Sequence, residues 1–327
     1  MSESHYFLLV ALASALLVGL VRRLALAHGV IDHPTDRGSH RVPTPRGGGL
    51  GAVVVIAAAF VVRAVQVGDT RVLVGTAAML AVAAIGWLDD RRGLPVRDRL
   101  AVHVLGGIAV AALWMQAAPP GVLTAVLALW WIFWTVSSIN LVNFMDGING
   151  LVASQIAIFA GSLMLFGGEA VGASWYAAAV AAACIGFLPW NFPHARIFLG
   201  DVGSGALGLL VPFVAVLAMR DAGIDVVRAH LPLLPLFGDA AVTIVRRWRR
   251  GETLTQPHRS HLYQRMANGG SGHTRVTLLY AAVSLCGAIV AHSSGAAKRL
   301  PLIAAYVVGV ALLGTLLDRR VAGVPQS

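Results

Sequence analysis

Long apolar runs recur along the whole chain, and they constrain its fold more than any other feature of the sequence. Runs of about 17–22 predominantly apolar residues have the length that a helix needs to cross a hydrocarbon core of ~30 Å. Of the 327 residues, 57% are hydrophobic and 12% are charged, whereas soluble domains carry about a quarter charged residues. The pattern predicts an all-α, polytopic integral membrane protein in which residues 1–327 form one membrane-embedded domain.

The apolar runs predict about eleven transmembrane helices. Arg22 and Arg23 follow the first run instead of preceding it, so the run is not typical of a cleavable signal peptide and its start is expected outside the cell. An odd number of spans then places the end of the chain inside. The expected spans cover roughly residues 6–26, 48–66, 72–88, 101–116, 122–140, 150–167, 173–190, 205–218, 230–245, 276–292 and 300–317.

The basic residues support this orientation. All but six of the 25 Lys and Arg residues fall in the loops predicted to be inside, as the positive-inside rule requires. The net charge of the chain is +10, and its basic residues lie in short loops between apolar runs. In a membrane protein such loops attract anionic lipids and phosphate ligands, so we expect these as partners and expect no nucleic acid. The six exceptions are Arg63, Arg71, Arg220, Arg228, Lys298 and Arg299.

The inside loops also hold the acidic side chains that could do chemistry. Asp89 and Asp90 end the third apolar run, where carboxylates are unfavourable unless they are compensated. A hard divalent cation would compensate them; the simpler alternative is pairing with Arg91 and Arg92. Asp201 lies among glycines, where it presents either an isolated carboxylate in a tight loop or an Asx turn that starts a span.

Amide and basic side chains occupy two further inside loops. Asn143, Asp146 and Asn149 are spaced at i, i+3 and i+6, which on a helix would place them on one face; N-capping of the next helix would explain Asn149 alone. In the first inside loop, His40 and Arg46 are expected to contact phosphate. The alternative there is a loop that only sets topology, before a glycine-rich packing face.

The last long inside loop contains a compact cluster of hydrogen-bond donors. His258, Arg259 and His261 suit a diphosphate, and a zinc site is the weaker interpretation because no third ligand is near. Asp239 lies within an expected span, where an acid is either functional or paired with an arginine further along its helix. Carboxylates, glycines and basic residues on one face of the membrane together suit phosphoryl transfer, which relies on positioning and charge neutralisation.

Five motifs occur in order between residues 28 and 275: DHPTDRGSHRVPTPRGGGLG, GWLDD, NFMDGINGL, FLGDVGSG and HRSHLYQR. They resemble the motifs of the polyprenyl-phosphate N-acetylhexosamine-1-phosphate transferases, the glycosyltransferase family 4 that also includes phospho-N-acetylmuramoyl-pentapeptide transferase. The resemblance implies a UDP-N-acetyl sugar as donor, undecaprenyl phosphate as acceptor, and Mg²⁺ as cofactor with Mn²⁺ as the alternative. It also implies a bacterial inner-membrane protein whose active site faces the cytoplasm; the oligomeric state stays open, with a homodimer as one option.

The resemblance assigns roles to the matching positions. The expected catalytic and metal-binding acids are Asp89, Asp90 and Asp201. The expected substrate-binding side chains are Asn143, Asp146, Asn149, His258, Arg259, His261, Arg46 and His40.

This chain departs from the family pattern at two points. Many members carry Asp where it has Asn149, and the muramoyl-pentapeptide branch carries consecutive histidines where it has His-Arg-Ser-His. The latter form resembles the O-antigen-initiating branch, whose donors are UDP-GlcNAc or a deoxy relative.

The reaction expected for that branch is direct attack of the lipid phosphate on the β-phosphorus of the donor. It releases UMP and starts synthesis of a cell-surface polysaccharide. A two-step route through an aspartyl phosphate stays open, as does the muramoyl-pentapeptide reaction. An ion-coupled transporter is the alternative from another class, although most spans lack the mid-span polar groups and the chain lacks the repeated halves that transporters commonly show.

Overall fold

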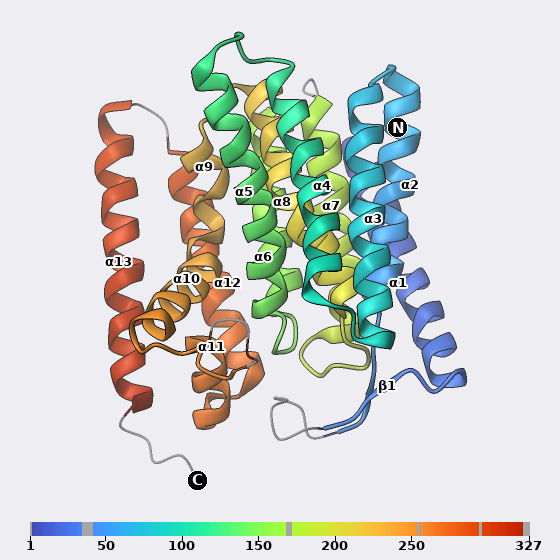
Figure 1. Cartoon of the computed structure of the whole chain (residues 1–327), viewed down its shortest axis with the longest axis vertical. Helices are drawn as coiled ribbons and strands as arrows, with labels where there is room; N and C mark the ends of the chain where they lie inside the picture. The colour runs from blue at the N-terminus through green and yellow to red at the C-terminus, as the bar shows by residue number, and fades with distance from the viewer. Residues whose placement is uncertain are drawn as a thin grey trace.

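The protein is described by a computed structural model that covers residues 2–34, 42–167, 172–253, 256, 258–293 and 296–322. These residues form a bundle of helices with one short antiparallel hairpin (Figure 1). This architecture confirms the predicted all-α, polytopic fold. The elements are α1 (Glu3–Ala27), β1 (Ile31–Asp32), β2 (Thr44–Pro45), α2 (Gly49–Val67), α3 (Thr70–Arg92), α4 (Val96–Met115), α5 (Val122–Met145), α6 (Leu151–Gly167), α7 (Gly172–Asn191), α8 (Asp201–Ala222), α9 (Val226–His230), the 3-10 turn η1 (Leu231–Leu233), α10 (Leu234–Arg249), α11 (Leu262–Met266), the π-helical turn η2 (Ala267–Ser271), α12 (Gly272–Ala291) and α13 (Ala296–Ala322).

Within the described ranges, nine helical segments are long and apolar enough to cross a membrane: α1 to α5, α7, α8, the segment from α11 to α12, and α13. Two of the expected spans take another form. α6 is apolar but has only 17 residues, and the expected span 230–245 is divided among α9, η1 and α10. Pro232 and Pro235 account for the division, because proline lacks the N–H that continues a helix and fits only its first turn.

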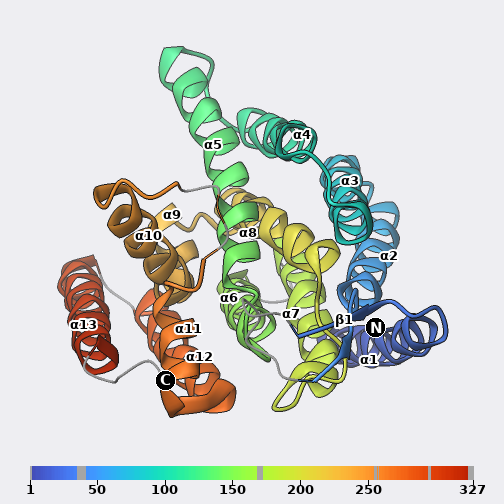
Figure 2. The same cartoon turned by 60° about the horizontal axis from the view of Figure 1, so that its bottom comes forward.

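Helix α8 forms the centre of the bundle, and α13 forms one edge (Figure 2). In its most apolar window, 94% of α8 is buried inside the protein, whereas none of the corresponding window of α13 is buried. Helices α2 to α7 surround α8, and α13 packs against α10, α11 and α12. An apolar helix with so little burial has lipid as its natural surroundings.

The hairpin β1–β2 lies at the lower end of the bundle in Figure 1. Its second strand continues into backbone hydrogen bonds with the segment before α8. Gly48 N–H donates to the carbonyl of Phe198 at 2.8 Å, and Phe198 N–H donates to the carbonyl of Pro45 at 2.8 Å. These bonds fix Arg46 beside the first residue of α8.

Candidate active site

Glycines allow three helices to meet closely at the site. A Cβ atom on Gly86 of α3 would lie 2.4 Å from the backbone oxygen of Asp201, and one on Gly49 of α2 would lie 2.3 Å from Cα of Gly203 in α8. Only glycine leaves space for such close backbone contact. Asp201 is the first residue of α8, so of the two alternatives left open by the sequence, its position at the start of a span is confirmed and the isolated carboxylate in a loop is wrong.

Arg46 bridges two of the predicted acids. Its Nη2 lies 2.6 Å from Oδ1 of Asp90 and 3.1 Å from Oδ1 of Asp201. Oδ2 of Asp90 also accepts a hydrogen bond from the backbone N–H of Asp201 at 2.9 Å, so Asp90 caps the start of α8, where the helix dipole favours a carboxylate. The Asp90 side chain is 8% exposed and that of Asp201 is 23% exposed, which makes Asp201 the more accessible acid.

Asp146 adds a third carboxylate to this group. It caps the end of α5, and burial together with repulsion from Asp201 raises the pKa of Asp146 to about 7, against the opposing influence of Arg46. Asn143, one turn earlier, donates to Oγ of Ser204 at 3.2 Å. Three carboxylates outnumber one arginine, so ionisation of all three acids leaves an excess of negative charge, and a bound cation favours this ionised state.

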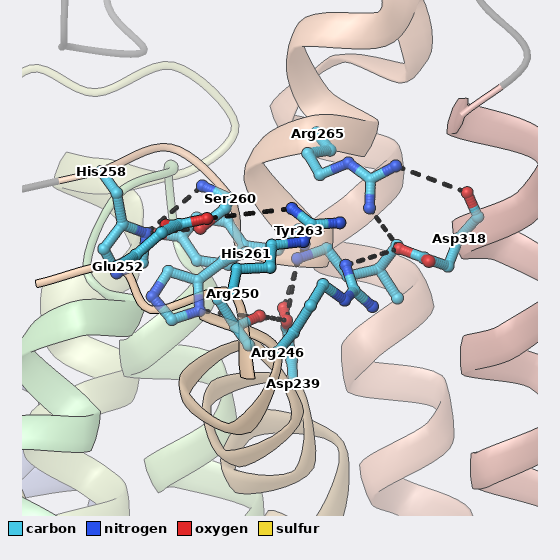
Figure 3. A network of polar contacts seen from close by, with 12 residues as sticks. Asp239, Arg246, Arg250, Glu252, His258, Ser260, His261, Tyr263, Arg265 and Asp318 are labelled. Atoms are coloured by element: carbon cyan, nitrogen blue, oxygen red, sulfur yellow. Dashed lines mark hydrogen bonds and ion pairs between the residues drawn. The ribbon is translucent and has the colours of Figure 1, made fainter. Parts of the chain in front are cut away.

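Asp239 of α10 anchors the loop of residues 258–261 (Figure 3). Its oxygens accept hydrogen bonds from the backbone N–H groups of Leu262 at 2.8 Å and Tyr263 at 3.0 Å, which are at the start of α11 and have no partner within that helix. The sequence predicts either a functional acid or an ion pair with an arginine of α10 at this position. The structure shows that Asp239 positions the loop through backbone N–H groups, and a direct role of this acid in the reaction stays a prediction.

Tyr263 connects that loop to the end of α5. Its hydroxyl donates to the carbonyl of Phe144 at 3.0 Å, and a Cβ atom on Gly147 would lie 2.2 Å from this hydroxyl. The rings of His258 and His261 lie 4.8 Å apart between centroids. Burial lowers the pKa of both imidazoles to about 4, so both are neutral at pH 7.

Comparison with known proteins identifies the family of this chain. The model for glycosyl transferase family 4 matches residues 72–219. The chain is 33% identical to the decaprenyl-phosphate N-acetylglucosaminephosphotransferase of Mycolicibacterium smegmatis, over 93% of this chain and 86% of that relative. The chain belongs to glycosyl transferase family 4.

Two further relatives also resemble this family 4 protein. A probable undecaprenyl-phosphate N-acetylglucosaminyl 1-phosphate transferase of Bacillus subtilis is 27% identical over 84% of this chain and 79% of the relative. The phospho-N-acetylmuramoyl-pentapeptide-transferase of Nostoc punctiforme is 35% identical, but over only 45% of this chain and 47% of the relative. The family resemblance predicted from the five motifs is confirmed, and the protein is a multi-pass membrane member of the family.

In this family 4 protein, the two adjacent acids at the end of α3 have different partners. Whereas Asp90 faces Arg46, Asp89 accepts hydrogen bonds from Arg99 and from the backbone N–H of Leu94 at 2.6 Å. These contacts fix the short turn between α3 and α4. Metal binding by Asp89 stays a prediction, and the structure favours Asp90 as the partner of Asp201.

The motif around Asp146 does not form the helical face that its spacing predicts. Helix α5 ends at Met145, so Asn143 lies on the helix and Asn149 lies in the turn that follows. The amide of Asn149 donates to the carbonyl of Pro193 at 3.0 Å, which ties this turn to the segment between α7 and α8. A nucleotide contact by Asn149 stays a prediction.

The geometry fits a divalent cation that substrates help to hold. Among the described residues, no three His, Cys, Asp or Glu side chains are arranged to hold a metal ion. Mg²⁺ commonly uses one or two carboxylates and completes its octahedron with substrate phosphates and water. Asp90 and Asp201 each direct a carboxylate oxygen toward one positive charge, the Arg46 guanidinium. The two carboxylates that Mg²⁺ commonly needs from the protein are therefore present side by side. His40 lies outside the described residues, and its contact with phosphate stays a prediction.

Proposed function

We propose that this family 4 protein transfers N-acetylglucosamine 1-phosphate, or that of a deoxy relative, from the UDP-sugar to undecaprenyl phosphate. The products are the polyprenyl-diphosphate sugar and UMP, and the lipid product starts a cell-surface polysaccharide. The observation that carries the proposal is the group formed by Arg46, Asp90, Asp146 and Asp201, which combines three carboxylates with one arginine at the end of the bundle. The choice of donor is supported by two relatives named for N-acetylglucosamine, which match 84% and 93% of the chain, against 45% and 61% for two muramoyl-pentapeptide relatives.

The proposed reaction is a direct displacement. An oxygen of the lipid phosphate forms a bond to the β-phosphorus of the donor, and the bond from that phosphorus to the oxygen bridging the two phosphates breaks, so UMP leaves with the electron pair. A phosphomonoester has its second pKa near ~6 and is largely ionised at neutral pH, so no strong general base is required. The Asp90 side chain is 8% exposed and pairs with Arg46. We therefore propose that Asp90 positions Arg46 and the cation and does not accept a proton.

Cation binding is the role proposed for Asp90 and Asp201, with Asp146 beside them. Mg²⁺, or Mn²⁺ in its place, neutralises charge on the diphosphate and the lipid phosphate when it is bound. Arg46 has five N–H donors in a planar fork and contributes positive charge at the same point. The anionic substrates can then approach each other despite their like charges.

Donor binding is the role proposed for the loop of residues 258–261. His258, Arg259 and His261 are proposed to donate hydrogen bonds to the diphosphate. In the free protein the His261 side chain is only 2% exposed and its Nδ1 lies 3.9 Å from Asp239, so it forms the inner part of this site. Tyr263 ties this loop to the end of α5, close to Asp146. Soluble nucleotide-sugar is cytoplasmic, so we place this end of the bundle at the cytoplasmic face of the inner membrane, in agreement with the distribution of basic residues.

Acceptor binding is supported by an apolar cavity of about 410 Å³ beside the acids. Arg46 and Asp90 line one part of it, and Val21, Leu24 and Trp87 line another. An isoprenoid phosphate needs this combination of a charged point and an apolar surface.

A transfer assay with the purified protein tests the proposal. UDP-GlcNAc and UDP-MurNAc-pentapeptide are each supplied with undecaprenyl or decaprenyl phosphate, and the lipid product is identified by mass. We expect a lipid-diphosphate GlcNAc and an equal amount of UMP, both abolished by EDTA. Efficient turnover of the muramoyl donor, or no lipid product from any donor, would refute the proposal. Exchange of labelled UMP into UDP-GlcNAc without a lipid acceptor would show the two-step route instead.

A further inference from the structure

A second cavity of about 410 Å³ lies between α10, α12 and α13, away from the acids. Its walls are mostly aliphatic, including Val242 of α10, Leu279 and Val283 of α12, and Val310 and Leu317 of α13. The outer side of α13 is apolar and exposed, so this groove lies at the edge of the bundle, where lipid surrounds the protein. Its dimensions and lining suit a hydrocarbon chain.

A charged cluster lies beside this groove, and Figure 3 shows its members Arg246, Arg265 and Asp318 pointing toward one another. Arg246 of α10 lies 3.1 Å from Asp318 of α13, and Arg265 of α11 contacts the same carboxylate. Arg246 and Asp318 also line the groove. Arg246 and Arg265 share the carboxylate of Asp318, so these three side chains carry one net positive charge. Asp239, which also lines the groove, accepts hydrogen bonds from the backbone N–H groups at the start of α11.

We propose that the groove binds an anionic phospholipid of the cytoplasmic leaflet, with an acyl chain between α10 and α13 and its phosphate on Arg246 and Arg265. Basic pockets between transmembrane helices on the cytoplasmic side are typical sites for anionic headgroups. A guanidinium has five N–H donors, so it can bind a phosphate while it stays paired with Asp318. The headgroup supplies the negative charge that the cluster lacks.

The position of the groove distinguishes this lipid from the acceptor substrate. Helix α13 packs against α10, α11 and α12, whereas Arg46 and Asp90 lie where α2, α3 and α8 meet. Figure 2 shows α13 and α3 at opposite sides of the bundle. A phosphate held by Arg246 therefore lies away from Arg46 and Asp90, where the acceptor phosphate is proposed to bind.

The bound lipid would contact the helix that follows the donor loop. Arg265 belongs to α11, and Asp239, which holds the start of α11, also lines the groove. The proposed lipid site can be tested separately from the proposed transfer reaction, because lipid binding is measured without either substrate.

The test compares two identical substitutions on one helix. Gly314 lines the groove and Gly309 is exposed on α13, and a Cβ atom at either position meets nothing within 4 Å. Wild-type protein, Gly314→Leu and Gly309→Leu are reconstituted in nanodiscs of phosphatidylcholine with a minor fraction of phosphatidylglycerol. Retained lipid is then counted by native mass spectrometry. We expect Gly314→Leu to lose at least ~10-fold of the retained phosphatidylglycerol, and Gly309→Leu to retain the wild-type amount.

A charge variant tests the headgroup contact separately. Arg246→Gln should still retain lipid but lose the preference for phosphatidylglycerol over phosphatidylcholine, whereas Arg97→Gln, whose side chain is 86% exposed near α4, should keep that preference. Equal retention by Gly314→Leu and Gly309→Leu, or an unchanged preference in Arg246→Gln, would overturn the proposal. Displacement of phosphatidylglycerol from wild-type protein by undecaprenyl phosphate would overturn it as well, because the occupant would then be the acceptor.

Discussion

Asp90 accepts a hydrogen bond from the backbone N–H of Asp201 at 2.9 Å, and this bond joins the last turn of α3 to the first residue of α8. The two residues that are proposed to hold the cation are therefore also part of the contact that packs these helices. Gly86, one turn before Asp90, makes the contact close enough. Packing and charge at the site cannot be changed independently, so the substitutions of Gly86, Tyr263, Arg46 and Asp201 below are each compared with a control substitution of the same residue type.

Gly86→Ala tests the packing. The new methyl group would lie 2.4 Å from the backbone oxygen of Asp201, so α3 and α8 must separate. Overpacking of this kind costs about 1–3 kcal/mol, and we expect a lower thermal unfolding temperature together with reduced transfer activity. Gly161→Ala in α6, where the added Cβ meets nothing within 4 Å, should keep both. Wild-type activity and stability in Gly86→Ala would show that this contact does not assemble the site.

Tyr263→Phe tests the connection between the donor loop and α5. It removes a hydrogen bond from the tyrosine hydroxyl to the carbonyl of Phe144, and Tyr306→Phe removes an equivalent bond to the carbonyl of Val283. A net loss of ~1 kcal/mol predicts a KM for the donor about 5-fold higher in Tyr263→Phe. The KM for the acceptor and the kinetics of Tyr306→Phe should not change. An equal effect of the two substitutions on the donor KM would contradict a specific role for Tyr263.

The depressed pKa of His258 predicts a pH dependence of donor binding. Burial lowers this pKa from 6.5 to about 4 in the free protein, and an adjacent diphosphate favours the imidazolium and raises it. The complex then binds more protons than the free protein, so the Kd for the donor should fall as the pH falls from about 6.5 toward 4. Calorimetry on wild-type protein and His258→Gln separates this effect from titration of the donor itself. Identical slopes for the two proteins would exclude a contact between His258 and the diphosphate.

Arg46→Gln removes the positive charge between Asp90 and Asp201. Without it, the three carboxylates repel one another, and we expect a lower unfolding temperature in EDTA. Because a ligand that binds the folded state stabilises it, Mg²⁺ should raise the unfolding temperature of Arg46→Gln more than that of wild-type protein. Arg97→Gln is the matched control on the exposed start of α4. The same response to Mg²⁺ in all three proteins would place the cation elsewhere.

The membrane fold and the acids of the site were accessible from the sequence for different reasons. Apolar runs and basic loops report directly on membrane crossing, so the helices agree with the expected spans at all but two places. There α6 has only 17 residues, and Pro232 and Pro235 divide the span 230–245. Asp201 and Asp90 stand at the ends of apolar runs, where a carboxylate needs compensation. That argument does not separate Asp90 from Asp89, because only the crossing of α3 and α8 decides which acid faces Arg46.

The contacts that position the site are not predictable from local spacing. Asp239 accepts hydrogen bonds from backbone groups of Leu262 and Tyr263, and no side-chain pattern records such partners. The only feature of the sequence that indicated a special role for Asp239 was its position within an apolar run. Gly86 and Gly203 show a similar limit, since a glycine identifies a close contact but not the helix on the other side of it.

The measurement that tests the central claim most directly is the Mg²⁺ dependence of transfer by Asp201→Asn. The substitution keeps the size of the side chain and removes its charge, so the fold should persist, and Asp98→Asn, at a 49% exposed side chain of α4, is the control. We predict that Asp201→Asn loses at least ~10²-fold in turnover, equivalent to ~3 kcal/mol of electrostatic stabilisation. It should also need more Mg²⁺ for half-maximal rate, with only partial rescue at high Mg²⁺. Near-normal turnover of folded Asp201→Asn with an unchanged Mg²⁺ dependence would contradict the account.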